Sequence, residues 1–291
     1  MFRPRLLLRL LAIQRVLVRH GLDELVRSSH LLRPARVLFW LSPAAWRSRH
    51  EDKPRGVRIR EALEELGPIF VKFGQSLSTR QDLLPPDIGT ELAKLQDQVP
   101  PFPADQARQI IADAYGRPPE EVFAEIEPEA LAAASIAQVH LARLPSGEEV
   151  IVKILRPGVR ERIAADLEVM YTLARLCQRY WPDSRRLKPV EVVSEYEQTI
   201  YNELDLLREA ANAAQLRRNW LDSDQMYVPE IYWDYCNEQV LVQERIHGIP
   251  INDMPALEAA GTNIERLAIN GVEIFFTQVF RDNFFHADMH P

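Results

Sequence analysis

The sequence predicts an α+β protein: a helical N-terminal part, a small antiparallel sheet with inserted helices, and a further helix near the end of the chain. Two observations predict this class. Apolar residues recur at helical spacing before residue 118, and again over 159–180, 190–220 and 264–280. Between these stretches the spacing changes to period two, in Val139, Leu141, Val150, Val152 and Ile154. A turn at 145–148 separates the two runs, so we expect a hairpin there and further strands at 227–233 and 240–243.

Composition indicates a globular protein of a reducing compartment. The chain has 291 residues and is 46% hydrophobic, which is enough apolar material for a core without disulfides. Cys177 and Cys236 show no metal-ligand spacing, so we expect both to be packing residues. The net charge of -7 is unevenly distributed, because residues 1–60 carry fourteen Lys or Arg and only four Asp or Glu.

The first twenty residues predict a basic amphipathic helix. They contain five arginines and no acid among many leucines, so the helix could lie on an anionic membrane surface or dock on its own protein. Both interpretations stay open. A signal peptide is disfavoured, because Arg9 and Arg15 interrupt any apolar core and no small-residue cleavage pattern follows. No stretch of the chain is long and apolar enough for a transmembrane helix.

Five further helical stretches are expected before the sheet. A helical stretch follows Gly21, and a basic linker occupies 47–60. The expected helices then cover 59–66, a stretch opened by Gly67-Pro68 and closed by Pro85-Pro86, 88–95 and 106–115.

The helix after Pro68 carries a polar stripe that a plain core helix does not need. Its apolar line comprises Ile69, Phe70, Phe73 and Leu77, and the polar stripe beside it comprises Lys72, Gln75, Ser76 and Thr79. Lysine is scarce in this chain, with five lysines among 35 basic residues, so a retained lysine hints at a site that needs a compact ammonium. A solvated surface is the alternative.

Lys153 lies within an apolar strand, where an unpaired cation would be costly. Carboxylates follow on the long predicted helix 190–220, at Glu203, Asp205 and Glu209, with Asp205 and Glu209 four residues apart on one face. We therefore expect Lys153 to have a charged partner. For the acidic helix, a solvated face neutralised by nearby arginines is the alternative.

The order of these features resembles the protein-kinase fold: a loop over the phosphates, a strand lysine, an acidic helix, a hinge, and a His-x-Asp segment. Val150-Ile151-Val152-Lys153 matches the kinase lysine strand, Gln243-Glu244-Arg245-Ile246 falls at the hinge, and His286-Ala287-Asp288 matches the catalytic loop. Alanines replace the usual glycines of the phosphate loop, in Leu131-Ala132-Ala133-Ala134-Ser135. With Lys72-Phe73-Gly74-Gln75 and Glu203-Leu204-Asp205, this pattern is similar to the UbiB family, atypical kinase-like factors of bacterial ubiquinone biosynthesis.

The resemblance implies a fold, domains and a site. The fold would be kinase-like, with a helical N-terminal extension over 1–118, an N-lobe with inserted helices over 119–246, and a C-lobe from 247 that stops at the catalytic loop. Asp288, Lys72 and Gln75 would be catalytic. The nucleotide would contact the following residues: Leu131, Ala132, Ala133, Ala134, Ser135, Ile136, Ala137, Lys153, Glu203, Asp205, Glu209, Glu244 and Ile246. The resemblance also implies that Lys153 pairs with Glu209. The helix that carries Lys72 and Gln75 would cover the nucleotide cleft.

The resemblance also implies ATP and Mg²⁺ as cofactors and the cytoplasmic face of the inner membrane as location. Expected partners are the membrane surface, reached by the basic N-terminus, isoprenoid-quinone precursors and other ubiquinone-biosynthesis proteins; no nucleic acid is expected. The activity would be ATP hydrolysis or phosphotransfer that helps to mobilise lipid precursors, without protein phosphorylation. A non-catalytic nucleotide-sensing scaffold is the alternative, and a choline-kinase-like enzyme is disfavoured because such enzymes lack the Lys72 to Gln75 segment.

The last residues leave two expectations. The sequence ends at Pro291, before the metal-binding segments of the family, so we expect no turnover from these 291 residues alone. A metal site made of His286, Asp288 and His290 is disfavoured, because side chains two residues apart in an extended chain are about 7 Å apart and do not converge on one ion. No metal ligand is therefore assigned.

Overall fold

The computed structural model describes residues 4–22, 53–78, 84–95, 101–180 and 188–285. Contacts divide the chain into two units, which are interleaved in the sequence. We call them the helical unit (Met1–Pro101, Ala133–Ala137 and Leu155–Leu204) and the sheet unit (Phe102–Ala132, Gln138–Ile154 and Asp205–Pro291). The three successive domains expected from the sequence stay a prediction.

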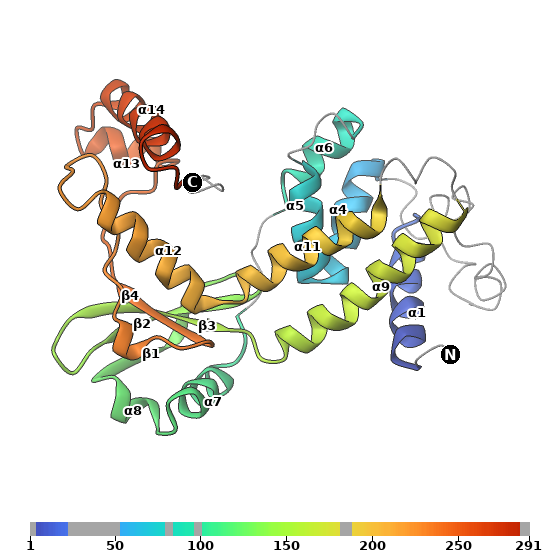
Figure 1. The fold of residues 1–291 in the computed structure, drawn as a ribbon, viewed down its shortest axis with the longest axis horizontal. Helices are drawn as coiled ribbons and strands as arrows, with labels where there is room; N and C mark the ends of the chain where they lie inside the picture. Colours follow the sequence, from blue (N-terminus) through green and yellow to red (C-terminus); the bar gives the residue numbers. More distant parts are fainter. Residues whose placement is uncertain (1–3, 23–52, 79–83, 96–100, 181–187, 286–291) are drawn as a thin grey trace. The chain divides into compact units, whose positions relative to one another are not determined.

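The helical unit is a bundle. It contains α1 (Pro4–Arg19), α4 (Arg55–Leu66), α5 (Pro68–Ser78), α6 (Pro86–Leu92), α9 (Val159–Tyr180) and α11 (Pro189–Glu203). Helix α4 packs on α5 and α6, α1 packs on α4 and α9, and α9 packs on α11 (Figure 1). Gly67 separates α4 from α5 as predicted, and its φ of 110° is one that a side chain would disfavour.

The sheet unit combines four strands with helices on either side. Its elements are α7 (Ala104–Tyr115), α8 (Pro119–Val122), β1 (Glu125–Ala133), β2 (Ala137–Arg143), β3 (Glu149–Leu155), α12 (Leu206–Asn219), a 3-10 turn (Trp233–Tyr235), β4 (Val240–Glu244), α13 (Met254–Ala259) and α14 (Ile264–Phe280). The strand order is β1-β2-β3-β4, and β3 and β4 are antiparallel with Ile151 opposite Gln243 and Lys153 opposite Leu241.

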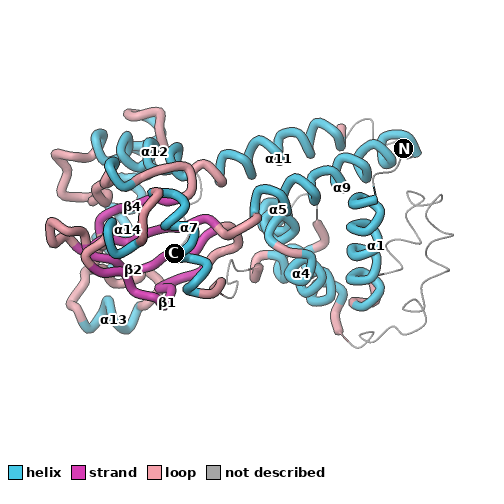
Figure 2. Tube along the Cα trace, turned by 90° about the horizontal axis from the view of Figure 1, so that it is seen from below, coloured by secondary structure: helices cyan, strands magenta, loops and turns pink. Residues whose placement is uncertain are grey.

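The two faces of this sheet have different roles. Val150, Val152 and Ile154 are fully buried and form a core with α7 and α8 on one face. Because side chains alternate along a strand, Ile151 and Lys153 lie on the opposite face, toward α12. Figures 1 and 2 show α7 and α12 on opposite sides of the sheet. One face is therefore structural, and the other is available for a site.

The α+β class and the hairpin are confirmed, as are the helices at 159–180 and 264–280. The helix predicted over 190–220 was wrong as one helix, because the Asp205 side chain accepts a hydrogen bond from the Arg208 N–H and caps a second helix, α12. The strand predicted at 227–233 was also wrong, since only Ile231 forms a bridge, to Gln243. Strand β1 and helix α13 were not predicted, and α4 begins inside the predicted linker.

Candidate nucleotide site

Lys153 and Glu209 form the charged centre of the sheet unit. The Lys153 ammonium lies 2.7 and 2.8 Å from the two carboxylate oxygens of Glu209. Strand alternation places Lys153 on the α12 face, and the Asp205 cap starts α12 so that Glu209 falls on its first turn. The two side chains that the resemblance pairs are thus together, and the exposed fractions of 27% and 42% leave both accessible to a ligand.

A pocket lies on the same side of the sheet unit. Its volume is about 490 Å³, which is in the range of ligand sites. It is lined by Leu131, Ile151, Pro229, Gln243, Glu244, Arg245, Ile246, His247 and Gly248. Three of these residues, Leu131, Glu244 and Ile246, were candidates from the sequence. Ile151 was not, although period-two alternation already places it on the Lys153 face.

The geometry of the pocket and the ion pair suits an elongated ligand. Ile151 and Lys153 are two residues apart on one strand, or about 7 Å at the usual rise of a β-strand. Leu131 and Ile151 offer apolar walls to a flat ring. Within the described residues, no hydrogen bond involves the main chain of Ile246, so its N–H and carbonyl are available.

Glu244 is held by its neighbours at the edge of the pocket. Its two carboxylate oxygens accept hydrogen bonds from the Tyr227 hydroxyl at 2.7 and 2.6 Å, and one also accepts from the Glu230 N–H at 3.0 Å. Burial opposes ionisation, but these bonds and the positive charge of Arg217 outweigh it, so the pKa of Glu244 is lowered from its ordinary value. The Glu244 N–H donates to the Glu230 carbonyl, which fixes the main chain as well.

The alanine loop joins β1 to β2. Leu131, Ala132 and Ala133 end β1, residues 134–136 form the connection, and Ala137 begins β2. Ser135 is completely buried, and its hydroxyl has no hydrogen-bond partner within the described residues. The hydroxyl therefore faces the protein interior in this conformation.

Lys72 and Gln75 have partners inside the helical unit. The Lys72 ammonium lies 3.4 Å from a carboxylate oxygen of Glu203, so two of the sequence signatures are in contact. The Gln75 amide donates to the Leu95 carbonyl at 3.1 Å. Asp205, by contrast, serves as a helix cap. Nucleotide contact by these residues stays a prediction.

Some candidates lie outside the described residues. They are Asp288, with its neighbours His286 and His290, Thr79, and the side chain of Ser76. Among the described residues, no group of three or more His, Cys, Asp or Glu could hold a metal ion.

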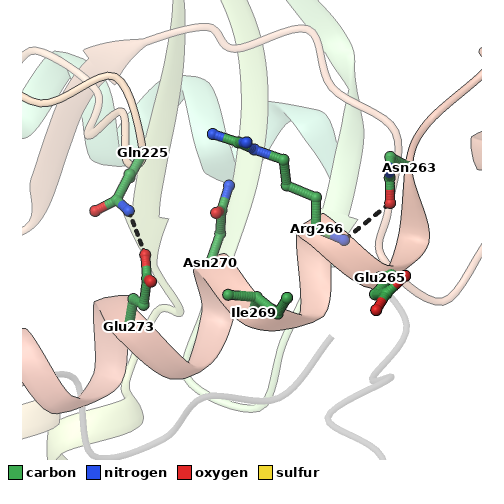
Figure 3. Close-up of a pocket in the computed structure, with 7 residues that line it drawn as sticks. All are labelled: Gln225, Asn263, Glu265, Arg266, Ile269, Asn270 and Glu273. Atoms are coloured by element: carbon green, nitrogen blue, oxygen red, sulfur yellow. Dashed lines mark hydrogen bonds between the residues drawn. The ribbon is translucent and has the colours of Figure 1, made fainter.

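A second pocket of the sheet unit was not expected from the sequence. It has a volume of about 350 Å³ and is lined by Gln225, Asn263, Glu265, Arg266, Ile269, Asn270 and Glu273. Figure 3 shows Gln225, Asn270 and Arg266 on one side of α14, with the Gln225 amide donating to Glu273 at 2.6 Å. The sequence did not reveal this pocket, because polar residues at helical spacing, such as those of α14, are also typical of a solvated helix face.

The basic N-terminal helix α1 packs within the helical unit. Ile13 and Val18 are buried, and Arg9 donates to Asp166 of α9 and to the Leu66 carbonyl. Burial raises the pKa of Asp166, and Arg9 offsets only part of this rise. Of the two interpretations of the basic N-terminal helix, docking of the helix on its own protein is thus observed. Contact of this helix with a membrane stays a prediction. In the described segments, no helix combines the length and apolarity that crossing a membrane requires.

Comparison with known proteins places these features in a family. Residues 94–291 match the model of the ABC1 atypical kinase-like domain. Proteins named probable protein kinase UbiB are 57% identical in Marinobacter nauticus, over 97% of this chain and 52% of that protein, and 55% identical in Aeromonas salmonicida, over 99% and 53%. The chain thus spans about half the length of these curated relatives.

A solved structure shares the fold. The complex of Rv3197 with erythromycin from Mycobacterium tuberculosis superimposes with a TM-score of 0.55 at 27% identity, over 92% of this chain and 62% of that one. The match covers both units.

Proposed function

The chain belongs to the ABC1 atypical kinase-like family, and from this membership we propose that it is an ATP-binding kinase-like enzyme that supports ubiquinone synthesis. The observation that carries the proposal is the ion pair of Lys153 and Glu209 beside a ligand-sized pocket on one sheet face. A lysine held in place by a carboxylate supplies a fixed positive charge for phosphate oxygens.

In this proposal the bound nucleotide has one orientation on this face of the sheet. Adenine enters the pocket between Leu131 and Ile151 and bonds to the main chain at Glu244 and Ile246. The phosphates then extend toward Lys153, which lies about 7 Å along the strand. When bound, Mg²⁺ would neutralise phosphate charge.

The remaining candidates complete the site in this proposal. Lys72 and Gln75 cover the nucleotide, Glu203 orients Lys72, and Asp288 orients the attacking hydroxyl or water. The alanine loop, with less backbone freedom than a glycine loop, gives the phosphates a differently shaped cradle. The proposed acceptor is water or a lipid precursor, although the relatives are named probable protein kinases.

The proposed location is the cytoplasmic face of the bacterial inner membrane, with α1 as the contact. Exposed Arg15 is available to anionic headgroups while Arg9 and Arg19 bind Asp166 and Glu65.

Nucleotide binding tests the proposal. The 291-residue chain is titrated with a fluorescent ADP, with and without Mg²⁺, beside Lys153→Ala and Glu209→Gln. Loss of a charged contact to phosphate should weaken affinity about tenfold or more in Lys153→Ala. Lys188→Ala is the matched control, because Lys188 forms an exposed ion pair with Glu191 at 2.8 Å. Equal affinity of the wild type and Lys153→Ala would refute the site.

A further inference from the structure

Two arginines near the start of α9 have no role in the proposed function. Arg156 precedes the helix, and Arg160 lies four residues later in its first turn. Each donates a side-chain hydrogen bond to a main-chain carbonyl of another segment of the helical unit. Both acceptors belong to signature segments of the sequence.

Arg156 holds the alanine loop at two points. Its Nε donates to the Ala134 carbonyl at 2.8 Å, and its main-chain N–H donates to the Ile136 carbonyl at 2.8 Å. The loop also closes on itself, because the Ala134 N–H donates to the Ala137 carbonyl at 2.8 Å. The residue between these anchors is Ser135.

The loop conformation held by Arg156 has an energetic cost. Ser135 is completely buried with no partner for its hydroxyl within the described residues, and such a group disfavours the state that buries it. Burial and neighbouring Arg162 also lower the pKa of Arg156 from its ordinary value. The two bonds from Arg156 work against these costs.

Arg160 holds the turn at the end of α11. Its guanidinium donates to the Leu204 carbonyl at 3.2 Å, and Leu204 itself is completely buried. Carbonyls at the C-terminus of a helix lack intrahelical partners, so a cation there is favourable. The preceding residue is Glu203, which pairs with Lys72 of α5.

We propose that Arg156 and Arg160 are positioning residues that link the alanine loop to the Glu203–Leu204 turn and, through Glu203, to Lys72. Movement of the loop is transmitted to the turn, because both are attached to the same rigid end of α9. The part of this inference that concerns nucleotide rests on the proposed function.

Hydrogen exchange measured without nucleotide tests the two anchors. In Arg156→Ala, exchange of the Ala134 amide should accelerate about tenfold or more, the scale of one charge-assisted bond. In Arg160→Ala, the same should hold for the Leu204 amide, which donates to the Ile200 carbonyl. Arg162→Ala, an exposed arginine of the same turn, is the control. Wild-type exchange at both amides in the two variants would overturn the proposal.

Lysine variants at the same two positions provide a test in case the alanine variants fail to fold. Arg156→Lys and Arg160→Lys keep the charge but lose the directed guanidinium bond, and should show the same local acceleration. Wild-type exchange in both would mean that charge alone suffices, which would overturn the directed anchors.

Exchange in the presence of ADP tests the link. ADP should slow exchange in both the loop and the turn of the wild type, but only in the loop of Arg160→Ala. Equal protection of both segments in that variant would overturn the link. If ADP protects neither segment in any protein while the variants still loosen them, the nucleotide proposal fails and the anchoring roles remain.

Discussion

Lys153 of β3 and Glu209 of α12 form an ion pair with two hydrogen bonds, of 2.7 and 2.8 Å, across one face of the sheet. The lysine is a strand residue whose neighbours Val152 and Ile154 are fully buried on the other face. The main chain of Lys153 is therefore held in a rigid strand, while the ammonium at the end of its side chain stays accessible. An accessible ion pair of this kind is better suited to binding a ligand than to stabilising the fold.

The Lys153 and Glu209 pair is expected to add little to stability. Because the side chains are 27% and 42% exposed, a double-mutant cycle with Lys153→Met and Glu209→Gln should give a coupling of about 1 kcal/mol or less. Urea unfolding measures it. A coupling of about 3 kcal/mol or more would instead indicate a structural pair.

Lys72→Ala is expected to change nucleotide affinity and hydrolysis if Lys72 enters the site. The variant also removes the Lys72 ammonium that lies 3.4 Å from the Glu203 carboxylate and offsets its charge, so Glu203→Gln should partly restore the affinity. Titration with ADP and ATP measures both. Lys94→Ala is the control, because exposed Lys94 pairs with Glu91, three residues earlier in the chain. Unchanged nucleotide handling in Lys72→Ala would remove this residue from the site.

Gly56→Ala is expected to destabilise the helical unit by about 1–3 kcal/mol, because overpacking forces the backbone to shift. A β-carbon at Gly56 would lie 2.7 Å from the main-chain oxygen of Asp87, where α4 meets α6. Gly89→Ala in α6 is the control, since it meets nothing within 4 Å and should stabilise the helix by about 0.5–1 kcal/mol. Thermal unfolding should separate the two; equal melting temperatures would contradict the close packing.

Tyr227→Phe is expected to raise the pKa of Glu244 by removing its hydroxyl donor. The folded-state pKa of Glu244 is lowered from 4.5, so this carboxylate contributes stability above pH 4.5 that is lost as pH falls through the folded value. The stability difference between wild type and variant should thus be largest above pH 4.5 and shrink in acid. Unfolding measured from pH 3 to 7 checks this, with exposed Tyr201→Phe as control. A pH-independent difference would exclude Glu244 as the cause.

Ser135→Ala is expected to stabilise the protein by about 1 kcal/mol, because it removes a buried hydroxyl without a partner. Thermal unfolding measures this. Ser223→Ala, which removes an acceptor of the Gln225 N–H, should lower stability slightly. If Ser135→Ala destabilises, the hydroxyl has a partner in solution.

Local periodicity predicted much of the fold. The helices at 159–180 and 264–280 and the hairpin follow from apolar spacing, because a side chain's position on a helix or strand repeats with a fixed period. The same reasoning failed at Leu204, where helical spacing continues but Asp205 caps a new helix. It also missed β1, whose mostly exposed residues show no regular alternation.

The sequence by itself determined the family and the candidates Lys153 and Glu209, since their types and order form a recognisable pattern. Only the tertiary structure decided what surrounds them. The pocket requires Leu131, Ile151 and Gln243 to meet, which depends on strand order and register. Arg156 and Arg160 bind main-chain carbonyls, and because every residue has one, no sequence pattern reveals which carbonyl an arginine will reach.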